Sequence, residues 1–196
     1  MAEYIELCFR LGFFLTTPCN ICLSAYSHLK MSMLNILICG VKEVDDLIDE
    51  ADGVISIMNP GYTIYAPRSI ASRESENRYS VLRFEFDDVW HECYKLGMEI
   101  VTPEIIESAI SFAYDFVESF GDEATLLVHC HEGISRSAAI AIAIYTSLYE
   151  DAQDAVTRVS HQRPQAIPNI EVIRLTDDLL DMQGELYDAV AETFYR

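Results

Sequence analysis

The stretch that decides the fold is Leu126–Ala143, LLVHCHEGISRSAAIAIA. An apolar run ends in His-Cys-His, a short polar segment with a glycine and an arginine follows, and the chain then becomes apolar again. A buried strand, a loop and a central helix account for this order, because an element covered on all sides is apolar on all sides. Four interpretations of Cys130 are open at this point: a metal ligand, a redox centre, a nucleophile or a core cysteine.

Strand and helix patterns alternate along the rest of the chain. Short apolar or alternating runs predict strands, over 34–39, 53–58, 79–86 and 125–129. Helical patterns predict helices over 41–51, 103–119, 151–162 and 170–182, before a last amphipathic piece. Residues 135–149 alternate Ile and Ala as a strand could, but alanine is a poor strand former and both phases are apolar, which favours a helix buried on all sides. Residues 59–78 show neither pattern, and we expect a long loop there. The alternation predicts an α/β fold with a central, mostly parallel sheet flanked by helices.

The composition is that of one globular domain. Of the 196 residues, 51% are apolar, which is enough for a sizeable core. We expect the domain over 34–196, after a poorly ordered N-terminal extension over 1–33. The apolar run of that extension follows acidic residues and is split by Arg10, unlike a secretory signal, and it is too short for a membrane-spanning helix.

Charge and cysteine content narrow the function further. A net charge of −19 argues against nonspecific binding to nucleic acid or to anionic membrane surfaces, and we expect neither as a partner. The six cysteines show no disulfide-framework spacing, which indicates a reducing compartment.

The loop from Cys130 to Arg136 has the residues of an anion site. It opens a helix, whose first turn presents unpaired N–H groups and a partial positive charge. Gly133 permits a tight curl, and Arg136 offers a fork that matches two phosphate oxygens. The same field favours the thiolate form of Cys130, which makes this residue a nucleophile aimed at a bound phosphorus.

The other interpretations of Cys130 explain less. His129, Cys130 and His131 are consecutive, and neighbours in a strand point to opposite faces, so they do not converge on one metal ion. A plain core cysteine leaves the polar residues of the loop unexplained. No metal site is therefore expected.

The segment His129–Ser137, HCHEGISRS, resembles the signature HCxxGxxR[S/T] of the cysteine-dependent protein tyrosine phosphatases. Its GISRS form is most similar to the compact dual-specificity branch. RPQAIPN (163–169) resembles the segment that follows the post-loop helix in that branch, and related bacterial proteins carry a similar stretch. The resemblance implies a protein tyrosine phosphatase-like fold, with a phosphate-binding loop between a buried strand and a central helix. It also implies a bacterial-type, cytoplasmic enzyme without a cofactor.

The resemblance assigns roles to the residues of the loop. Cys130 attacks phosphorus and forms a phosphocysteine, and Arg136 binds the phosphate and stabilises the transition state. Ser137 bonds the cysteine sulfur and helps it to leave, while His129 gives structural support. The implied phosphate-binding residues are those of the loop, His131, Glu132, Gly133, Ile134, Ser135 and Arg136.

A general acid is also required, because an alkoxide or a phenoxide is a poor leaving group. The family supplies an aspartate from the loop after the preceding strand, which here ends FEFDD. In similar phosphatases with paired acids the second is usually the acid, which selects Asp88 over Asp87. Asp88 lies further before Cys130 than in the compact members, so Glu92 is a reserve candidate.

The resemblance implies a metal-independent phosphatase, and among the substrates of the superfamily we expect phosphoprotein, with phosphotyrosine first and phosphoserine or phosphothreonine as further ones. The partner is then a phosphorylated protein or peptide. The loop has no lysine and carries Glu132, which disfavours a highly charged inositol lipid. A catalytically inactive phosphate-binding module of the same fold is the alternative. As a further hypothesis, four arginines at five-residue intervals border the site and attract an anion, Arg68, Arg73, Arg78 and Arg83.

Overall fold

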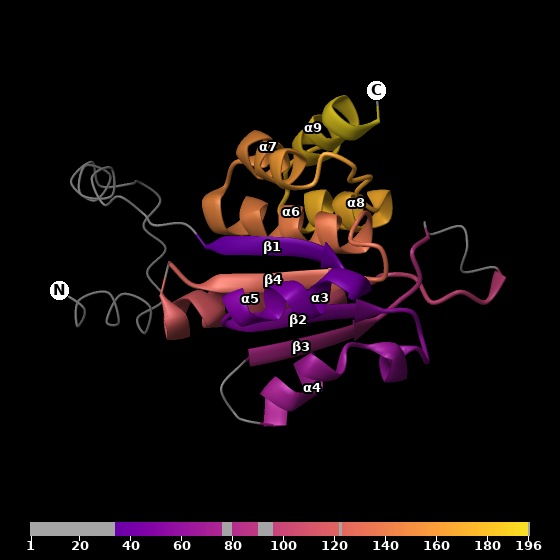
Figure 1. Ribbon diagram of the computed structural model, residues 1–196. Helices are drawn as coiled ribbons and strands as arrows, with labels where there is room; N and C mark the ends of the chain where they lie inside the picture. Colours follow the sequence, from indigo (N-terminus) through magenta and orange to yellow (C-terminus); the bar gives the residue numbers. More distant parts are fainter. Residues whose placement is uncertain (1–33, 76–79, 90–95, 122, 196) are drawn as a thin grey trace, which may run out of the picture. The chain divides into compact units, whose positions relative to one another are not determined.

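Four parallel strands form the sheet, in the spatial order β1-β4-β2-β3 (Figure 1). They are β1 (Asn35–Gly40), β2 (Gly53–Met58), β3 (Ser80–Glu85) and β4 (Thr125–Cys130). The register aligns Gly40 with Cys130 and Ser56 with His129. The strand that ends in Cys130 is therefore a central strand, as its unbroken apolar sequence predicts.

The computed structural model describes residues 34–75, 80–89, 96–121 and 123–195. The predicted extension over 1–33 lies outside these residues. Within the described part of the chain, no helix is long and apolar enough to cross a bilayer.

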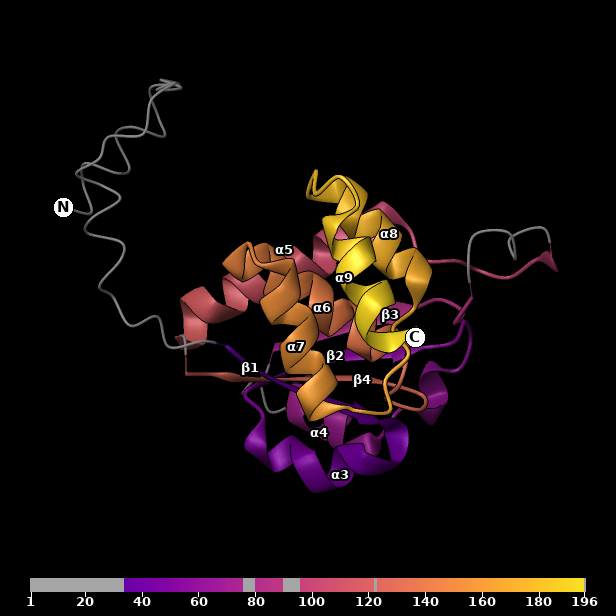
Figure 2. The ribbon, with the colours of Figure 1, turned by 90° about the horizontal axis from the view of Figure 1, so that it is seen from above.

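Helices cover both faces of the sheet (Figure 2). One face carries α5 (Pro103–Phe120), α6 (Arg136–Tyr149), α7 (Ala152–Gln162), α8 (Ile170–Leu179) and α9 (Glu185–Phe194). The other carries η1 (Val41–Glu43), α3 (Val44–Leu47), η2 (Ile48–Glu50) and α4 (Arg68–Ser75). Two separate apolar clusters result, because side chains of a strand alternate between faces: Ile38 belongs to the first cluster and Cys39 to the second.

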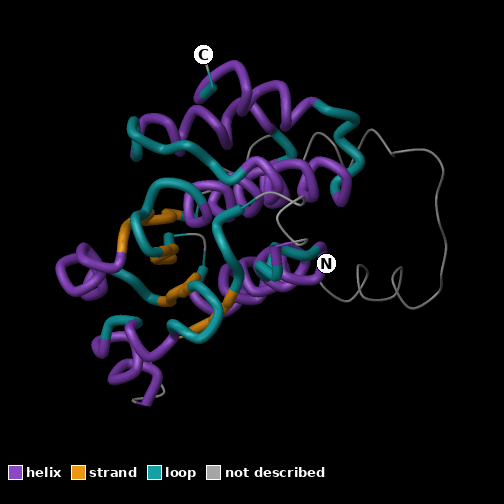
Figure 3. The backbone as a smooth tube through the Cα atoms, turned by 90° about the vertical axis from the view of Figure 1, so that its right-hand side faces the viewer, coloured by secondary structure: helices purple, strands orange, loops and turns teal. Residues whose placement is uncertain are grey.

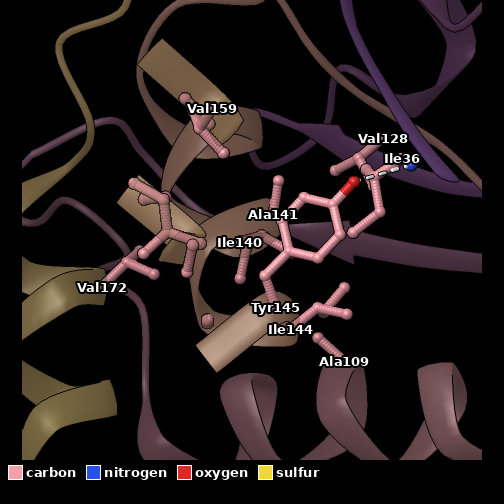
Figure 4. Close-up of a cluster of buried hydrophobic side chains, with 14 of the residues drawn as sticks. Ile36, Ala109, Val128, Ile140, Ala141, Ile144, Tyr145, Val159 and Val172 are labelled. Carbon is pink, nitrogen blue, oxygen red and sulfur yellow. Dashed lines mark hydrogen bonds between the residues drawn. The ribbon is translucent and has the colours of Figure 1, made fainter. Parts of the chain in front are cut away.

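Helix α6 is the centre of the larger cluster, and every residue from Arg136 to Thr146 is buried. Figure 4 shows Tyr145 of α6 among the aliphatic side chains of neighbouring elements, with its hydroxyl against the backbone of β1. That hydroxyl accepts a hydrogen bond from the Ile36 N–H at 3.0 Å, and the Tyr149 hydroxyl accepts one from the Leu34 N–H at 2.8 Å. The two tyrosines therefore tie β1 to the central helix as well as filling the core.

Two segments differ from the prediction. The helix expected over 41–51 is divided into η1, α3 and η2, and the loop expected over 59–78 contains η3 (Thr63–Tyr65) and α4. Helix α4 has a single buried residue, Ile70, so no apolar periodicity marks it. Polar contacts hold it in place: the Ser69 hydroxyl donates to Asp45 at 2.5 Å, and Arg73 pairs with Asp49.

Candidate active site

The carboxyl ends of the parallel strands meet at one end of the sheet, where ligands bind in such folds. Figure 3 faces this end and shows the loops gathered around the strands. Strand β4 brings Cys130 to this end, and α6 begins at Arg136 after the loop 131–135. The Val41 N–H donates to the His131 carbonyl at 3.1 Å, so the loop is fixed to the segment that follows β1.

Gly133 is at the turn of this loop, with φ +70°. A Cβ atom at this position would lie 2.3 Å from the Cys39 carbonyl carbon and 2.3 Å from the Gly40 nitrogen. Any side chain would therefore collide with the backbone of β1 as well as adopt a left-handed conformation. This close approach, together with the positive φ, explains why the loop requires glycine here.

The thiol of Cys130 is 2% exposed and faces two polar groups. Its Sγ lies 3.2 Å from the Ser137 Oγ, and the Gly133 N–H donates to it at 3.3 Å. Both groups are placed to stabilise negative charge on the sulfur. Cys39, on the neighbouring strand, differs: burial raises its pKa to about 12, so it stays a thiol.

His129 lies one residue before the thiol and is fully buried. Its Nε2 is 2.8 Å from the Ser56 Oγ, across the β2–β4 pair. Burial lowers the pKa of His129 to about 4, so the ring is neutral near pH 7. This position agrees with a structural role, because the ring is fully buried and lies against the neighbouring strand.

The guanidinium of Arg136 is 3% exposed and is held from two sides. Nη1 donates to the Phe86 carbonyl at 2.7 Å, and Nη2 donates to the Asn59 Oδ1 at 3.0 Å. Among the described residues, Nε has no hydrogen-bond partner, and it lies 3.9 Å from the Asp88 Oδ2. The fork is therefore oriented in advance, with a buried donor left for a ligand.

The two aspartates after β3 point to different partners. The Asp87 Oδ2 accepts from the Glu99 N–H at 3.0 Å, and the Asp87 N–H donates to the Glu99 carbonyl at 2.7 Å. The Asp88 Oδ1 accepts from the Ser135 hydroxyl at 2.6 Å and from the Asn169 Nδ2 at 2.8 Å. Asp87 also accepts from the Asn59 amide at 2.8 Å, so it fixes its own loop and the residue that bonds Arg136, whereas Asp88 contacts the loop 131–135 directly. Glu92 lies outside the described residues.

A partly exposed ion pair between Arg163 and Glu43 supports the loop from its outer side. The Arg163 Nε donates to the Gly133 carbonyl at 3.1 Å, while Nη1 and Nη2 donate to the Glu43 carboxylate at 2.9 and 2.7 Å. Glu43 also accepts from the Gly40 N–H at 2.7 Å. Hydrogen bonding to Arg163 lowers the pKa of Glu43, which keeps the pair charged over a wide range.

The remainder of RPQAIPN (163–169) follows the loop backbone closely. The Ile167 N–H donates to the Ile134 carbonyl at 3.0 Å, and the Asn169 N–H donates to the Ser135 carbonyl at 3.3 Å. This segment therefore fixes the second half of the loop in the way that Arg163 fixes its turn.

The exposed residues of the loop are His131 and Glu132, whose Nε2 and Oε1 atoms lie 3.3 Å apart. Of the four arginines expected near the site, Arg83 pairs with Glu74 at 2.8 Å, and Arg73 pairs with Asp49, as noted above. Arg78 lies outside the described residues. The anion-attracting role is weakened at Arg73 and Arg83, because carboxylates neutralise both.

Several residues that build the site were not expected from the sequence. Glu43 and Asn59 lie just beyond the ends of β1 and β2, and Ser56 lies opposite His129. Arg163 and Asn169 belong to the segment 163–169. Of these, only the residues of RPQAIPN could have been found from the sequence, because that segment resembles one in the dual-specificity branch. The resemblance did not assign a role to its residues. No group of three or more His, Cys, Asp or Glu side chains that could hold a metal ion occurs among the described residues.

No protein-family model matches the chain. A probable dual specificity protein phosphatase of Dictyostelium discoideum is 31% identical over 129 residues, which are 61% of this chain and 32% of the relative. The chain thus spans about a third of the length of the curated relative that it matches.

Solved structures share the fold at low identity. Tk-PTP in its active form has a TM-score of 0.56 and 16% identity, covering 76% of this chain and 92% of its own. Human DUSP28 has a TM-score of 0.52 and 18% identity, covering 76% and 94%. A human tyrosine phosphatase-like serine/threonine/tyrosine-interacting protein has a TM-score of 0.57 and 17% identity, covering 76% and 93%.

The chain has the protein tyrosine phosphatase fold, which confirms the predicted fold class. In sequence it is similar to the dual-specificity branch of the cysteine-dependent protein tyrosine phosphatases, which confirms the resemblance seen in HCHEGISRS.

Proposed function

We propose that the chain is a metal-independent phosphomonoester hydrolase that acts on phosphoprotein through a phosphocysteine intermediate. The observation that carries this proposal is the convergence of three groups. The Cys130 sulfur lies 3.2 Å from the Ser137 hydroxyl, and the buried Arg136 keeps its Nε available beside the loop. A nucleophile, a group that stabilises it when it leaves, and an oriented cation are the parts that transfer of a phosphoryl group needs.

In the proposed first step, the Cys130 thiolate attacks phosphorus while the bond from phosphorus to the leaving oxygen breaks. Asp88 gives its proton to that oxygen, and Arg136 binds the phosphoryl oxygens. In the second step, water attacks the phosphocysteine and Asp88 accepts a proton from it. The thiolate leaves with a hydrogen bond from the Ser137 hydroxyl, and inorganic phosphate is released.

The proposed substrate is a phosphorylated protein or peptide, with phosphotyrosine first and phosphoserine or phosphothreonine as further substrates. The exposed Glu132 on the loop supports this choice, because its charge repels a polyanionic headgroup. The structure of PTPMT1 in complex with PI(5)P shares the fold at 16% identity and a TM-score of 0.58. A phosphoinositide is therefore the control substrate to include.

Hydrolysis of 4-nitrophenyl phosphate in the presence of a chelator tests the proposal. We expect activity in the wild type that disappears in Cys130→Ser and falls strongly in Arg136→Lys, which keeps the charge but not the fork. Trapping of ³²P on the wild-type protein, but not on Cys130→Ser, would show the phosphocysteine. A folded wild type that binds phosphopeptide without hydrolysing it would establish the alternative, an inactive phosphate-binding module.

A further inference from the structure

Asp88 is held by two donors on one and the same oxygen. Its Oδ1 accepts the Ser135 hydroxyl at 2.6 Å and the Asn169 amide at 2.8 Å. Its Oδ2 is the oxygen near the Arg136 Nε, at 3.9 Å. A proton on the carboxyl group is therefore directed to Oδ2, because Oδ1 already accepts two hydrogens.

The Asn169 side chain is itself fixed in orientation. It caps helix α8, where its Oδ1 accepts from the N–H groups of Glu171 and Val172, both at 3.1 Å. Since a carboxamide has one oxygen and one NH₂ group, Nδ2 must then point the other way, toward Asp88. Asn169 is 7% exposed, so the surrounding residues also restrict its side chain.

We propose that Asn169 is a positioning residue for the general acid. It holds Asp88 with Oδ2 facing the leaving-group oxygen, and it connects the acid to a helix cap that does not depend on substrate. The proposal rests on the proposed function, because Asp88 has this task only if the chain is a phosphatase. Ser135 gives the second donor, from the phosphate-binding loop itself.

The test separates the amide donor from the helix cap. Asn169→Ser keeps a good N-cap residue, but its side chain is too short to reach Asp88. The assay compares kcat/KM for phenyl phosphate, whose leaving group needs a proton, with kcat/KM for 4-nitrophenyl phosphate, whose leaving group is a stable anion. General acid catalysis contributes about 10²–10⁴-fold, and we expect Asn169→Ser to lose about tenfold more on phenyl phosphate than on 4-nitrophenyl phosphate.

Two controls make the result specific. Asp151 caps helix α7, where it accepts from the Asp154 N–H at 2.8 Å, and Asp151→Ser should leave the ratio of the two substrates unchanged. In an Asp88→Asn background, Asn169→Ser should cause no further change in that ratio, because the acid that the Asn169 amide is proposed to position is then absent. Equal losses on both substrates, or the same change with and without Asp88, would overturn the proposal.

The proposed function fails in a different way. If the wild type hydrolyses neither compound, or if Cys130→Ser retains activity, the chain is not a thiolate phosphatase. If the wild type is active and depends on Cys130 but Asn169→Ser behaves as the wild type does, only the positioning role is refuted.

Discussion

Acidification below pH 6.5 should destabilise the protein through His129. The folded pKa of this buried ring is about 4, below its value of 6.5 in the unfolded chain. Between these two values the unfolded chain takes up a proton that the folded protein does not, so stability falls as the pH falls through this window. The difference between the two pKa values corresponds to about 3 kcal/mol of the free energy of unfolding. About 2 kcal/mol of this is lost between pH 7 and pH 5.

Urea unfolding at pH 7 and pH 5 measures this loss in the wild type and in His129→Gln. The variant lacks the titrating group, so its free energy of unfolding should change less between the two pH values, by about 2 kcal/mol. His161→Gln removes an exposed histidine and should keep the wild-type dependence. Equal pH dependence in the wild type and in His129→Gln, or an NMR titration midpoint of His129 near 6.5 in the folded protein, would refute the argument.

Three substitutions test other parts of the structure by urea unfolding at pH 7. Gly133→Ala forces a Cβ into the backbone of β1 at positive φ and should lower the free energy of unfolding by about 2–4 kcal/mol; a loss below 0.5 kcal/mol would contradict the close approach. Arg163→Lys keeps the charge but loses the fork and should cost about 1–2 kcal/mol, whereas an unchanged midpoint would show that the loop does not need it. Tyr145→Phe leaves the Ile36 N–H without its acceptor and should cost about 1–3 kcal/mol, against less than about 0.5 kcal/mol for the exposed Tyr114→Phe. Equal effects of the two tyrosine substitutions would contradict that contact.

The architecture could be predicted because its signals are local. The four strands carry short apolar runs, α5, α7 and α8 carry a helical period, and α6 is apolar on all sides and rich in alanine, so strands and helices were predicted within a few residues of their bounds. Helix α4 could not be found this way. It has one buried side chain, and its polar contacts to Asp45 and Asp49 come from a different segment of the chain.

The candidate site likewise has a part that could be predicted from the sequence and a part that could not. Cys130, Gly133, Arg136 and Ser137 lie within eight residues, so their chemistry is visible in one stretch of sequence. The groups that hold them are far away along the chain: Arg163 pairs with Glu43 at a separation of 120 residues. Such pairs follow from strand register and helix packing, which a single sequence does not reveal. The choice of Asp88 as the acid stays a prediction, now supported by contacts that Asp87 does not make.

The tyrosines that tie β1 to α6 have a consequence for association. Strand β1 is an edge of the sheet, and an unpaired edge is a template for strand addition by another chain. Here the N–H groups of Leu34 and Ile36 are bound by tyrosine hydroxyls, and the Ile36 carbonyl accepts from the Gln162 amide at 2.7 Å. The Gly40 N–H at the end of the strand is bound by Glu43. Side chains therefore occupy several of the positions that an incoming strand would need, which opposes intermolecular β-pairing at this edge.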